Sequence, residues 1–242
     1  MKKKTVTEAI EYRRSVRIFK DEDLDSEKVR NCIYNASLAP NSSNLQTWEF
    51  YHITDKKVLK DIAEACFNQN AARTANQLVV FVVRKDLWRK RAKANVDFLN
   101  SVFDKMDGKS KERKRKMALK YYNVAVPTMY TTFFGIFGYL RYIFFNIVGL
   151  FRPIFREVRR SDIRIVSHKS TGLAAQNFMM SMAEIGYDTC PMEGSDTTMV
   201  KRILNLPSGA EINMVIGCGI RDEKGIYSDR FRIPFDQVYK EI

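Results

Sequence analysis

The sequence lacks the residue patterns that mark several common classes of protein. Its four cysteines lie far apart, with no C-x-x-C pair and no zinc-ligand spacing. It has only two histidines, His52 and His168, and neither belongs to an H-E-x-x-H motif or to a Ser/Asp pattern typical of a hydrolase. We therefore expect no metal site and no catalytic triad, and we assign both histidines to surface or packing positions.

Signals for targeting, a coenzyme fold and domain division are also missing. No G-x-G-x-x-G follows a strand, which argues against a Rossmann site for a nicotinamide coenzyme. The basic start MKKKTVTEAIEYRRS is not followed by an apolar run, so we expect a cytoplasmic protein. Because no repeat or Gly/Ser linker divides the 242 residues, and this length can bury a core unaided, we predict one domain over 1–242.

Positive charge is concentrated in the middle of the chain. Residues 84–169 hold 21 Lys and Arg against 7 Asp and Glu, a net charge of +14, whereas the rest of the chain carries −1. The densest part is KSKERKRKMALK at 109–120, and the uncharged run Tyr121–Leu140 follows it. Arg141 interrupts the apolar character, and RPIFREVRR at 152–160 is again basic. The middle third therefore differs in composition from its flanks.

Several interpretations of this middle segment stay open. No nucleic-acid-reading motif accompanies the cations, so we expect no nucleic-acid partner. The uncharged run is long enough to cross a bilayer, but it contains Pro127, and extending it past Arg141 would bury a charge. An amphipathic, aromatic-rich helix could instead contact a membrane peripherally. The simplest interpretation is a helical excursion at about 86–162 that packs on another subunit or covers a pocket.

Hydrophobic periodicity predicts an α+β fold, a central sheet flanked by helices, because the strands are not spaced as regular βαβ units. We predict strands at residues 48–54, 78–83 and 214–220. We predict helices over residues 5–14 and 26–39, a helix capped by Asp55, further helices up to about residue 105, a long helix over 165–185 ended by Gly186, and a short helix from Asp196 to about Leu204.

Three clusters of residues carry chemistry that the local periodicity does not require. Arg13-Arg14-Ser15-Val16-Arg17 offers forked guanidinium donors to a phosphate or a planar carbonyl edge. The loop Pro40-Asn41-Ser42-Ser43-Asn44-Leu45-Gln46 offers backbone donors and short polar side chains. In Pro191-Met192-Glu193-Gly194, the glycine permits a ligand to approach the backbone closely. Each cluster alone would be read as a turn.

Together with the ending Arg230-Phe231-Arg232-Ile233-Pro234, these clusters occur in the order and approximate spacing of the FMN-dependent nitroreductase family. The chain resembles that family over roughly residues 5–83 and 165–240, whereas the intervening region is variable in the family. The resemblance implies a nitroreductase-like flavoprotein domain that forms a homodimer, with two FMN sites at the subunit interface.

The resemblance also implies roles for individual residues. Arg13, Arg14 and Ser15 match positions that hold the FMN phosphate and ribityl chain, and Arg17 matches the cation near flavin N1 and O2. Pro40, Asn41, Ser42 and Asn44 match the loop that reaches the flavin of the other subunit. Asn68, with Gln69 and Asn70 as register alternatives, matches the amide that reads the pyrimidine edge. Pro191 and Met192 lead into Glu193 and Gly194, which match the pair whose backbone N–H groups address N5 and O4. Arg230 and Arg232 match the C-terminal phosphate clamp.

By this resemblance the chain is an FMN-dependent NAD(P)H oxidoreductase. It would pass two electrons by a ping-pong mechanism to a nitroaromatic, quinone or similar flat acceptor, and no catalytic side chain is needed because the flavin does the redox chemistry. Two alternatives stay open: a reductive dehalogenase or flavin-modifying relative, and a basic protein that binds membrane or nucleic acid. The physiological acceptor and the choice between NADH and NADPH also stay open.

Overall fold

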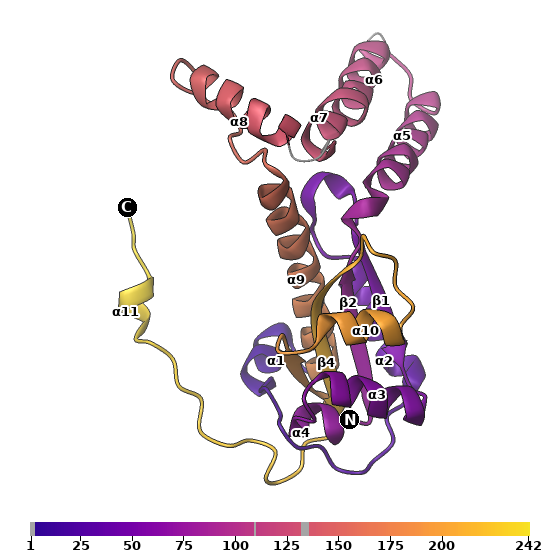
Figure 1. Cartoon of the computed structure of the whole chain (residues 1–242), viewed down its shortest axis with the longest axis vertical. Coiled ribbons are helices and arrows are strands. Elements are labelled where there is room, and N and C mark those ends of the chain that lie inside the picture. The colour runs from indigo at the N-terminus through magenta and orange to yellow at the C-terminus, as the bar shows by residue number, and fades with distance from the viewer. Residues whose placement is uncertain (1–2, 109, 132–135) are drawn as a thin grey trace.

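A four-stranded antiparallel sheet forms the centre of the protein (Figure 1), seen in a computed structural model that describes residues 3–108, 110–131 and 136–242. The strands are β1 (Trp48–Ile53), β2 (Gln77–Val83), β3 (Asp188–Met192) and β4 (Glu211–Gly219), in the spatial order β1-β2-β4-β3. Helices flank this sheet, which confirms the predicted α+β class.

Strand β2 lies in the middle of the core because every one of its residues is buried. Its side chains alternate between the two faces. On one face Phe81 packs with Phe178 of α9 (Arg160–Glu184) and with α2 (Ser26–Ser37). On the other face Val80 packs with Ile62 of α3 (Lys56–Ala65), and α10 (Thr197–Ile203) also covers this face. The sheet therefore has a separate apolar core on each side.

The short helix α4 (Asn70–Arg73) approaches the sheet closely at Gly217 of β4. A Cβ atom at Gly217 would lie 2.4 Å from the carbonyl oxygen of Ala71, which leaves no room for any side chain. Phe19 also lies within contact distance of this position. The glycine therefore sets how near the segment after α3 can come to the sheet.

Helix ends follow the predicted capping residues. The side chain of Asp55 accepts hydrogen bonds from Lys57 and Val58, and that of Asp196 accepts one from Met199. Gly186 has φ 83°, the left-handed conformation expected at the end of α9. These three predictions are confirmed.

Several element boundaries differ from the sequence prediction by one to three residues, and two larger differences concern α9 and β3. Helix α9 begins at Arg160 and not at residue 165, because Asp162 accepts the backbone N–H of Arg159 at 2.9 Å and so starts the helix earlier. Strand β3 was not predicted. It is an edge strand and contains Pro191, and an edge is the position where a sheet tolerates proline.

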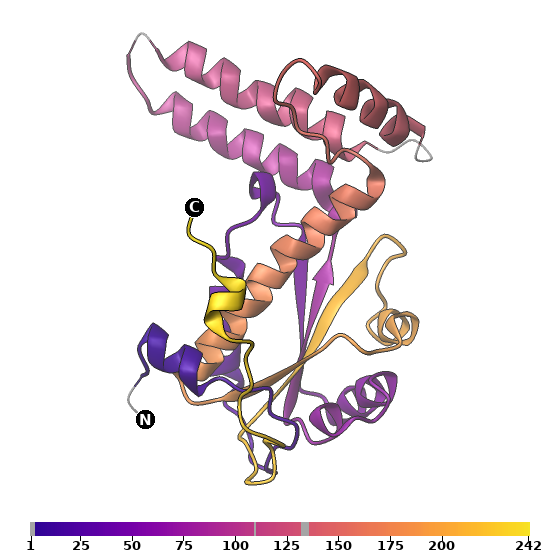
Figure 2. The same cartoon turned by 90° about the vertical axis from the view of Figure 1, so that its left-hand side faces the viewer.

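Most of the described part of the middle segment is helical, whereas residues 105–108 and 149–159 form turns and irregular structure. It contains α5 (Trp88–Asp104), α6 (Lys111–Lys120), a π-helical turn η3 (Tyr121–Ala125), α7 (Val126–Tyr130) and α8 (Ile136–Val148). Figures 1 and 2 show these helices beyond one end of the sheet, away from α1 (Val6–Tyr12). Residue 109 of the basic run and residues 132–135 of the uncharged run lie outside the described residues. Over the described ranges, no helix has both the length and the hydropathy that a membrane span requires.

The remaining elements are short. They are the 3-10 turns η1 (Ser42–Asn44) and η2 (Lys85–Leu87) and the helix α11 (Phe235–Val238). After β4 the chain returns past α1 and then leaves the sheet as an extended C-terminal segment (Figure 1). This return brings residues 226–232 beside the turn that follows α1.

Candidate functional site

The turn that follows α1 presents the first arginine cluster. Helix α1 ends at Tyr12, and Ser15 then forms a parallel bridge with Thr189 of β3. Val16 is fully buried in the core. Because successive residues of an extended chain point to opposite sides, burial of Val16 directs Ser15 and Arg17 away from the core.

The C-terminal segment is held against this turn by hydrogen bonds to backbone carbonyls. The guanidinium of Arg230 donates to the carbonyl oxygens of Glu11 at 2.8 Å and Arg13 at 2.6 Å. In return, Nη2 of Arg14 donates to the carbonyl oxygen of Ser228 at 2.6 Å. Since Arg230 sits at the C-terminal end of α1, its charge also offsets the negative end of that helix.

The two segments enclose a cavity of about 400 Å³. Its lining consists of Arg13, Arg14, Ser15, Arg17 and residues 226–232. The structure therefore brings together the predicted residues from both ends of the sequence, Arg230 and Arg232 included. Tyr227 and Ser228 also line it and were not singled out in the sequence, where no motif marks them.

The cavity has an excess of positive charge. Five arginines line it against one carboxylate, Asp229, and none of the five forms an ion pair with a carboxylate among the described residues. Burial lowers the pKa of Arg13, and the nearby charges of Arg230, Arg232 and Arg14 lower it further. Bringing like charges together in this way is unfavourable without a bound anion.

A phosphate group fits these residues. Its oxygens accept hydrogen bonds from the forked donors of arginine, and its two negative charges would relieve the repulsion that lowers the pKa of Arg13. The donors come from two segments that are already fixed to each other, so little ordering is needed on binding.

A buried ion pair between Asp188 and Arg221 supports the turn that follows α1. Asp188, almost fully buried at the start of β3, accepts two hydrogen bonds of 2.9 Å from the backbone N–H and Nε of Arg221. The guanidinium of Arg221 lies 4.1 Å from the centre of the Tyr12 ring and donates to the Tyr12 carbonyl. This cluster fixes the residue that immediately precedes Arg13. Sequence reasoning missed it, since Asp188 and Arg221 stand in no local motif.

The second part of the site runs along β3 and the loop after it. Pro191 and Met192 are the last residues of the strand, and Glu193 and Gly194 follow as exposed loop residues. A Cβ atom at Gly194 would meet no described atom within 4 Å, so the space over this backbone is open. A planar ring could therefore lie against the backbone here.

The turn between α3 and α4 joins this loop. Nε2 of Gln69 donates to the carbonyl oxygen of Gly194 at 3.2 Å, and Nδ2 of Asn70 donates to the hydroxyl of Tyr227 at 3.0 Å. Asn68 has φ 50° and lines a different cavity, of about 800 Å³, on the side of Thr74. Of the three register alternatives, the structure thus brings Gln69 and Asn70, and not Asn68, to the residues of the site.

The loop Pro40–Gln46 is well ordered by its own contacts. Oδ1 of Asn41 accepts the backbone N–H of Gln46 at 2.8 Å, and Asn44 exchanges hydrogen bonds of 2.9 Å with Asn95 of α5. The backbone N–H of Ser42 donates to the hydroxyl of Ser170 in α9. The loop is therefore fixed to both the excursion and the long helix.

This loop lies at the opposite end of the sheet from the arginine cavity. It leads into Trp48, which pairs with Val83, whereas Ser15 bridges Thr189 at the end where β4 pairs with the start of β2. Pro40, Asn41, Ser42 and Asn44 are consequently not brought to the cavity of their own chain. Within one chain, the predicted site residues form two separate groups.

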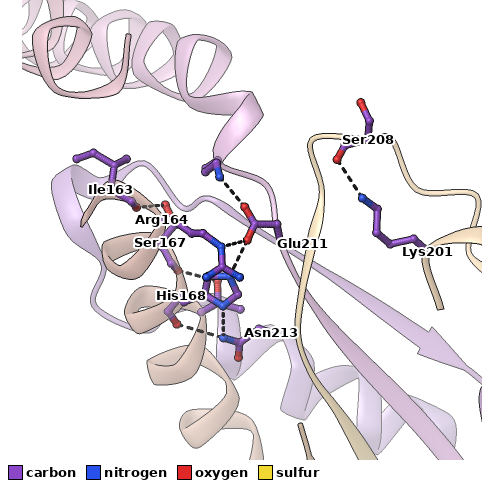
Figure 3. Close-up of polar contacts among 10 residues, drawn as sticks. Ile163, Arg164, Ser167, His168, Lys201, Ser208, Glu211 and Asn213 are labelled. Atoms are coloured by element: carbon purple, nitrogen blue, oxygen red, sulfur yellow. Dashed lines mark hydrogen bonds and ion pairs between the residues drawn. The ribbon is translucent and has the colours of Figure 1, made fainter. Parts of the chain in front are cut away.

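A charged network lies near the root of the excursion (Figure 3). Glu211 of β4 accepts hydrogen bonds from Lys85 at 2.5 Å, from His168 at 3.2 Å and from Arg164. Burial alone would raise the pKa of Glu211, but these three donors outweigh it and lower the pKa to about 2. Asn213 donates to the carbonyl oxygen of His168. The network thus joins α9, β4 and the start of the excursion, and His168 takes part in it through hydrogen bonds to Glu211 and Asn213.

Comparison with known families gives one match that spans most of the chain. The model of the Nitroreductase family matches residues 10–220. Protein DrgA of Synechocystis sp. is 26% identical over 217 residues, which cover 89% of this chain and 84% of that protein. A protein named NADH dehydrogenase from Thermus thermophilus is 24% identical over 226 residues, covering 93% and 90% of the two chains.

Solved structures share the fold. A protein from Exiguobacterium sibiricum, described as a nitroreductase and solved in complex with FMN, superposes with a TM-score of 0.69 and 18% identity. The superposition covers 100% of this chain and 99% of that one. At this identity the likeness establishes the fold and leaves the ligand to be argued from the site.

Proposed function

Because this chain belongs to the nitroreductase family, we propose that it is an FMN-dependent NAD(P)H oxidoreductase. It passes two electrons to a nitroaromatic, a quinone or a similar flat acceptor, in a ping-pong mechanism. The observation that carries the proposal is the cavity in which arginines from both ends of the chain converge without carboxylate partners among the described residues. The FMN complex of the related fold and the NADH dehydrogenase relative support it.

We assign phosphate binding to the cluster formed by Arg13, Arg14 and Arg232, with Ser15 beside them. A hydrogen bond to a charged group contributes roughly 1.5–3 kcal/mol, so several of them can hold a cofactor firmly. Arg230 lines the same cavity but directs its donors to the carbonyls of α1, so it also positions Arg13.

FMN, when bound, supplies the two-electron chemistry, and the side chains of this protein bind and orient it. Arg17 is the cation that we assign to the ring edge where negative charge gathers on reduction. The backbone of Glu193 and Gly194, with open space above it, orients the ring. Gln69 fixes the position of that loop through the Gly194 carbonyl.

A homodimer completes the site in this proposal. The Pro40–Gln46 loop is rigid, polar and remote from the cavity of its own chain. A second copy would bring its own loop to this cavity, so that Asn41 and Asn44 serve the cofactor held by the partner. NAD(P)H would bind transiently at the same open face that the acceptor later uses, which requires no Rossmann motif.

The proposal is tested by replacing Arg13 and comparing two flavins. Arg13→Ala should weaken FMN binding about 100-fold, because a charge-assisted contact from a partly buried arginine to the phosphate is lost. Binding of riboflavin, which has no phosphate, should change little. Affinities are measured by fluorescence titration of the apoprotein, with Arg30→Ala, an exposed arginine of α2, as the control.

Two results would reject the assignment. Purified protein that is colourless and does not take up added FMN would rule out the cofactor. Equal losses of FMN and riboflavin affinity in Arg13→Ala would show that Arg13 does not bind the phosphate. Initial rates with varied NADH and quinone should give parallel double-reciprocal lines, and intersecting lines would rule out the ping-pong mechanism.

A further inference from the structure

Helix α8 carries an exposed apolar face that the rest of the described chain does not cover. Its exposed side chains recur at helical spacing: Tyr139, Leu140, Ile143, Phe144 and Ile147. The chain continues this face with Leu150 and Phe151, which are 77% and 85% exposed. An exposed patch of this kind on a surface helix marks an interaction site.

Cations lie at the end of this face and not within it. Residues 149–160 contain Arg152, Arg156, Arg159 and Arg160 against the single acid Glu157. Arg141, the one charged residue of α8, donates to the carbonyl of Val158 and so turns toward the chain. The result is an uncharged, aromatic-rich helix face bordered by arginines, the pattern of a helix that lies at a membrane surface.

Helix α6 and the turn η3 also combine exposed apolar side chains with adjacent cations. Met117 and Val124 are exposed apolar side chains that line an open hollow together with Arg113, Lys116 and Lys120. Figures 1 and 2 place α6 and α8 beyond the same end of the sheet, the end away from α1. Two exposed apolar surfaces with adjacent cations thus occur at one end of the molecule.

We propose that α8, together with α6, docks the protein on the surface of an anionic lipid bilayer. The 13 residues of α8 span about 20 Å, less than the roughly 30 Å of a bilayer core, so the helix lies in the interface and does not cross it. Exposed aromatic rings such as Tyr139 and Phe144 enter the boundary between headgroups and acyl chains.

Charge selects a lipid surface over a second copy of this chain as the occupant. Residues 84–169 carry a net charge of +14, so two excursions facing each other would repel, and the remainder of a second copy carries a net charge of −1 and offers little attraction. A bilayer rich in anionic headgroups attracts each nearby cation. This inference goes beyond the proposed function and does not depend on it.

Vesicle binding by the purified full-length protein tests the proposal. Phosphatidylcholine vesicles that contain phosphatidylglycerol should sediment the protein, whereas pure phosphatidylcholine vesicles should bind it at least about tenfold more weakly. The double variants Phe144→Ser/Ile147→Ser and Arg152→Glu/Arg156→Glu should each lower the partition coefficient at least about tenfold. All variants should keep the unfolding midpoint of the unmodified protein, because the replaced side chains are exposed.

Matched control variants test whether a loss of vesicle binding comes from α8 and residues 149–160 or from any change in hydrophobicity or net charge. Tyr34→Ser/Leu38→Ser removes two similarly exposed apolar side chains from the end of α2 and the residue that follows it, and Lys56→Glu/Lys57→Glu makes the same charge change on α3. Both controls should bind vesicles like the unmodified protein. The proposal is overturned if the protein ignores anionic vesicles or if the controls lose binding equally. It is also overturned if sedimentation velocity shows that the α8 variants dissociate an oligomer while vesicle binding is unchanged, since α8 would then be a subunit interface.

Discussion

Arginine is used in two different ways at the two ends of this molecule. At the cavity, Arg14 and Arg230 are fixed by short hydrogen bonds to backbone carbonyls, and buried Val16 anchors the turn between them. On the excursion, Arg152 makes no side-chain hydrogen bond or ion pair in the described part of the chain, and Arg156 donates only to the carbonyl oxygen of Gly149, seven residues away, at 2.5 Å. The cavity arginines join two segments that are distant in sequence, whereas these arginines make only a local contact or none. Converging cations suit one small anionic ligand, whereas cations spread along a segment suit an extended surface.

The largest expected effect separates the packed core from the exposed excursion and compares a phenylalanine from each. Phe178 is fully buried between α9 and β2, so Phe178→Ala should lower the free energy of unfolding by about 3–5 kcal/mol. Phe144 is 59% exposed on α8, and Phe144→Ala should change it by less than about 0.5 kcal/mol. Urea unfolding measures both. Similar losses would show that α8 packs into the folded core and would remove the contrast.

The next largest effect concerns the support beneath the cavity. Arg221→Met leaves the buried carboxylate of Asp188 without its partner, and we expect a loss of about 3 kcal/mol in unfolding free energy. FMN affinity should fall as well, because Tyr12 and the adjacent Arg13 lose their fixed position. Arg30→Met, which breaks an exposed ion pair with Glu27, is the control and should cost less than about 0.5 kcal/mol.

A smaller effect should appear where the excursion joins the sheet. The pKa of Glu211 is about 2 in the folded protein, below its ordinary value of 4.5. Its ion pairs therefore stabilise the fold above pH 4.5, and this contribution is lost as the pH falls toward 2. Glu211→Gln should lower the unfolding free energy by about 1–2 kcal/mol at pH 7, a value reduced for partial solvent exposure. The difference from the unmodified protein should shrink at pH 3, and a difference independent of pH would contradict the assignment.

The smallest expected effects distinguish two arginines of the cavity, Arg17 and Arg232. Arg17→Ala should lower the FMN reduction potential by about 30–60 mV, because a cation that stabilises the reduced ring is lost. Its FMN affinity should change less than that of Arg232→Ala, which we expect to weaken phosphate binding with little change in potential. Anaerobic titration against a dye of known potential measures the first effect. An unchanged FMN reduction potential in Arg17→Ala would show that Arg17 does not lie at the ring edge that gains negative charge.

Local signals account for the parts of the fold that the sequence predicts well. Asp55 and Asp196 cap helices, and Gly186 ends one, because each acts on residues within three or four positions. Strand β2 is recognisable from its continuous apolar run. The arginine turn and the C-terminal arginines were found by their motif order, and the structure places them at one cavity.

Contacts between distant residues account for what the sequence did not predict. Asp188 and Arg221 lie 33 residues apart, and neither has a distinctive neighbour. Glu211 gathers donors from η2 and α9, which no spacing rule connects. Strand β3 is an edge strand of five residues with a proline, so its pairing with β4 and not its own pattern defines it. The choice between Asn68, Gln69 and Asn70 likewise depends on the turn's left-handed backbone.

The hydrogen bonds from Arg230 to the carbonyls at the end of α1 bear on the order in which parts of the protein form during synthesis. One wall of the cavity is made of residues 13–17 and the other of residues 226–232, so the sheet can form before the cavity exists. All four strands end by Gly219, so a chain that stops short of residue 226 would contain the whole sheet but only one wall of the cavity. Under the proposed function, such a chain would lack part of its phosphate site, and cofactor binding would have to wait for synthesis of the C-terminal segment.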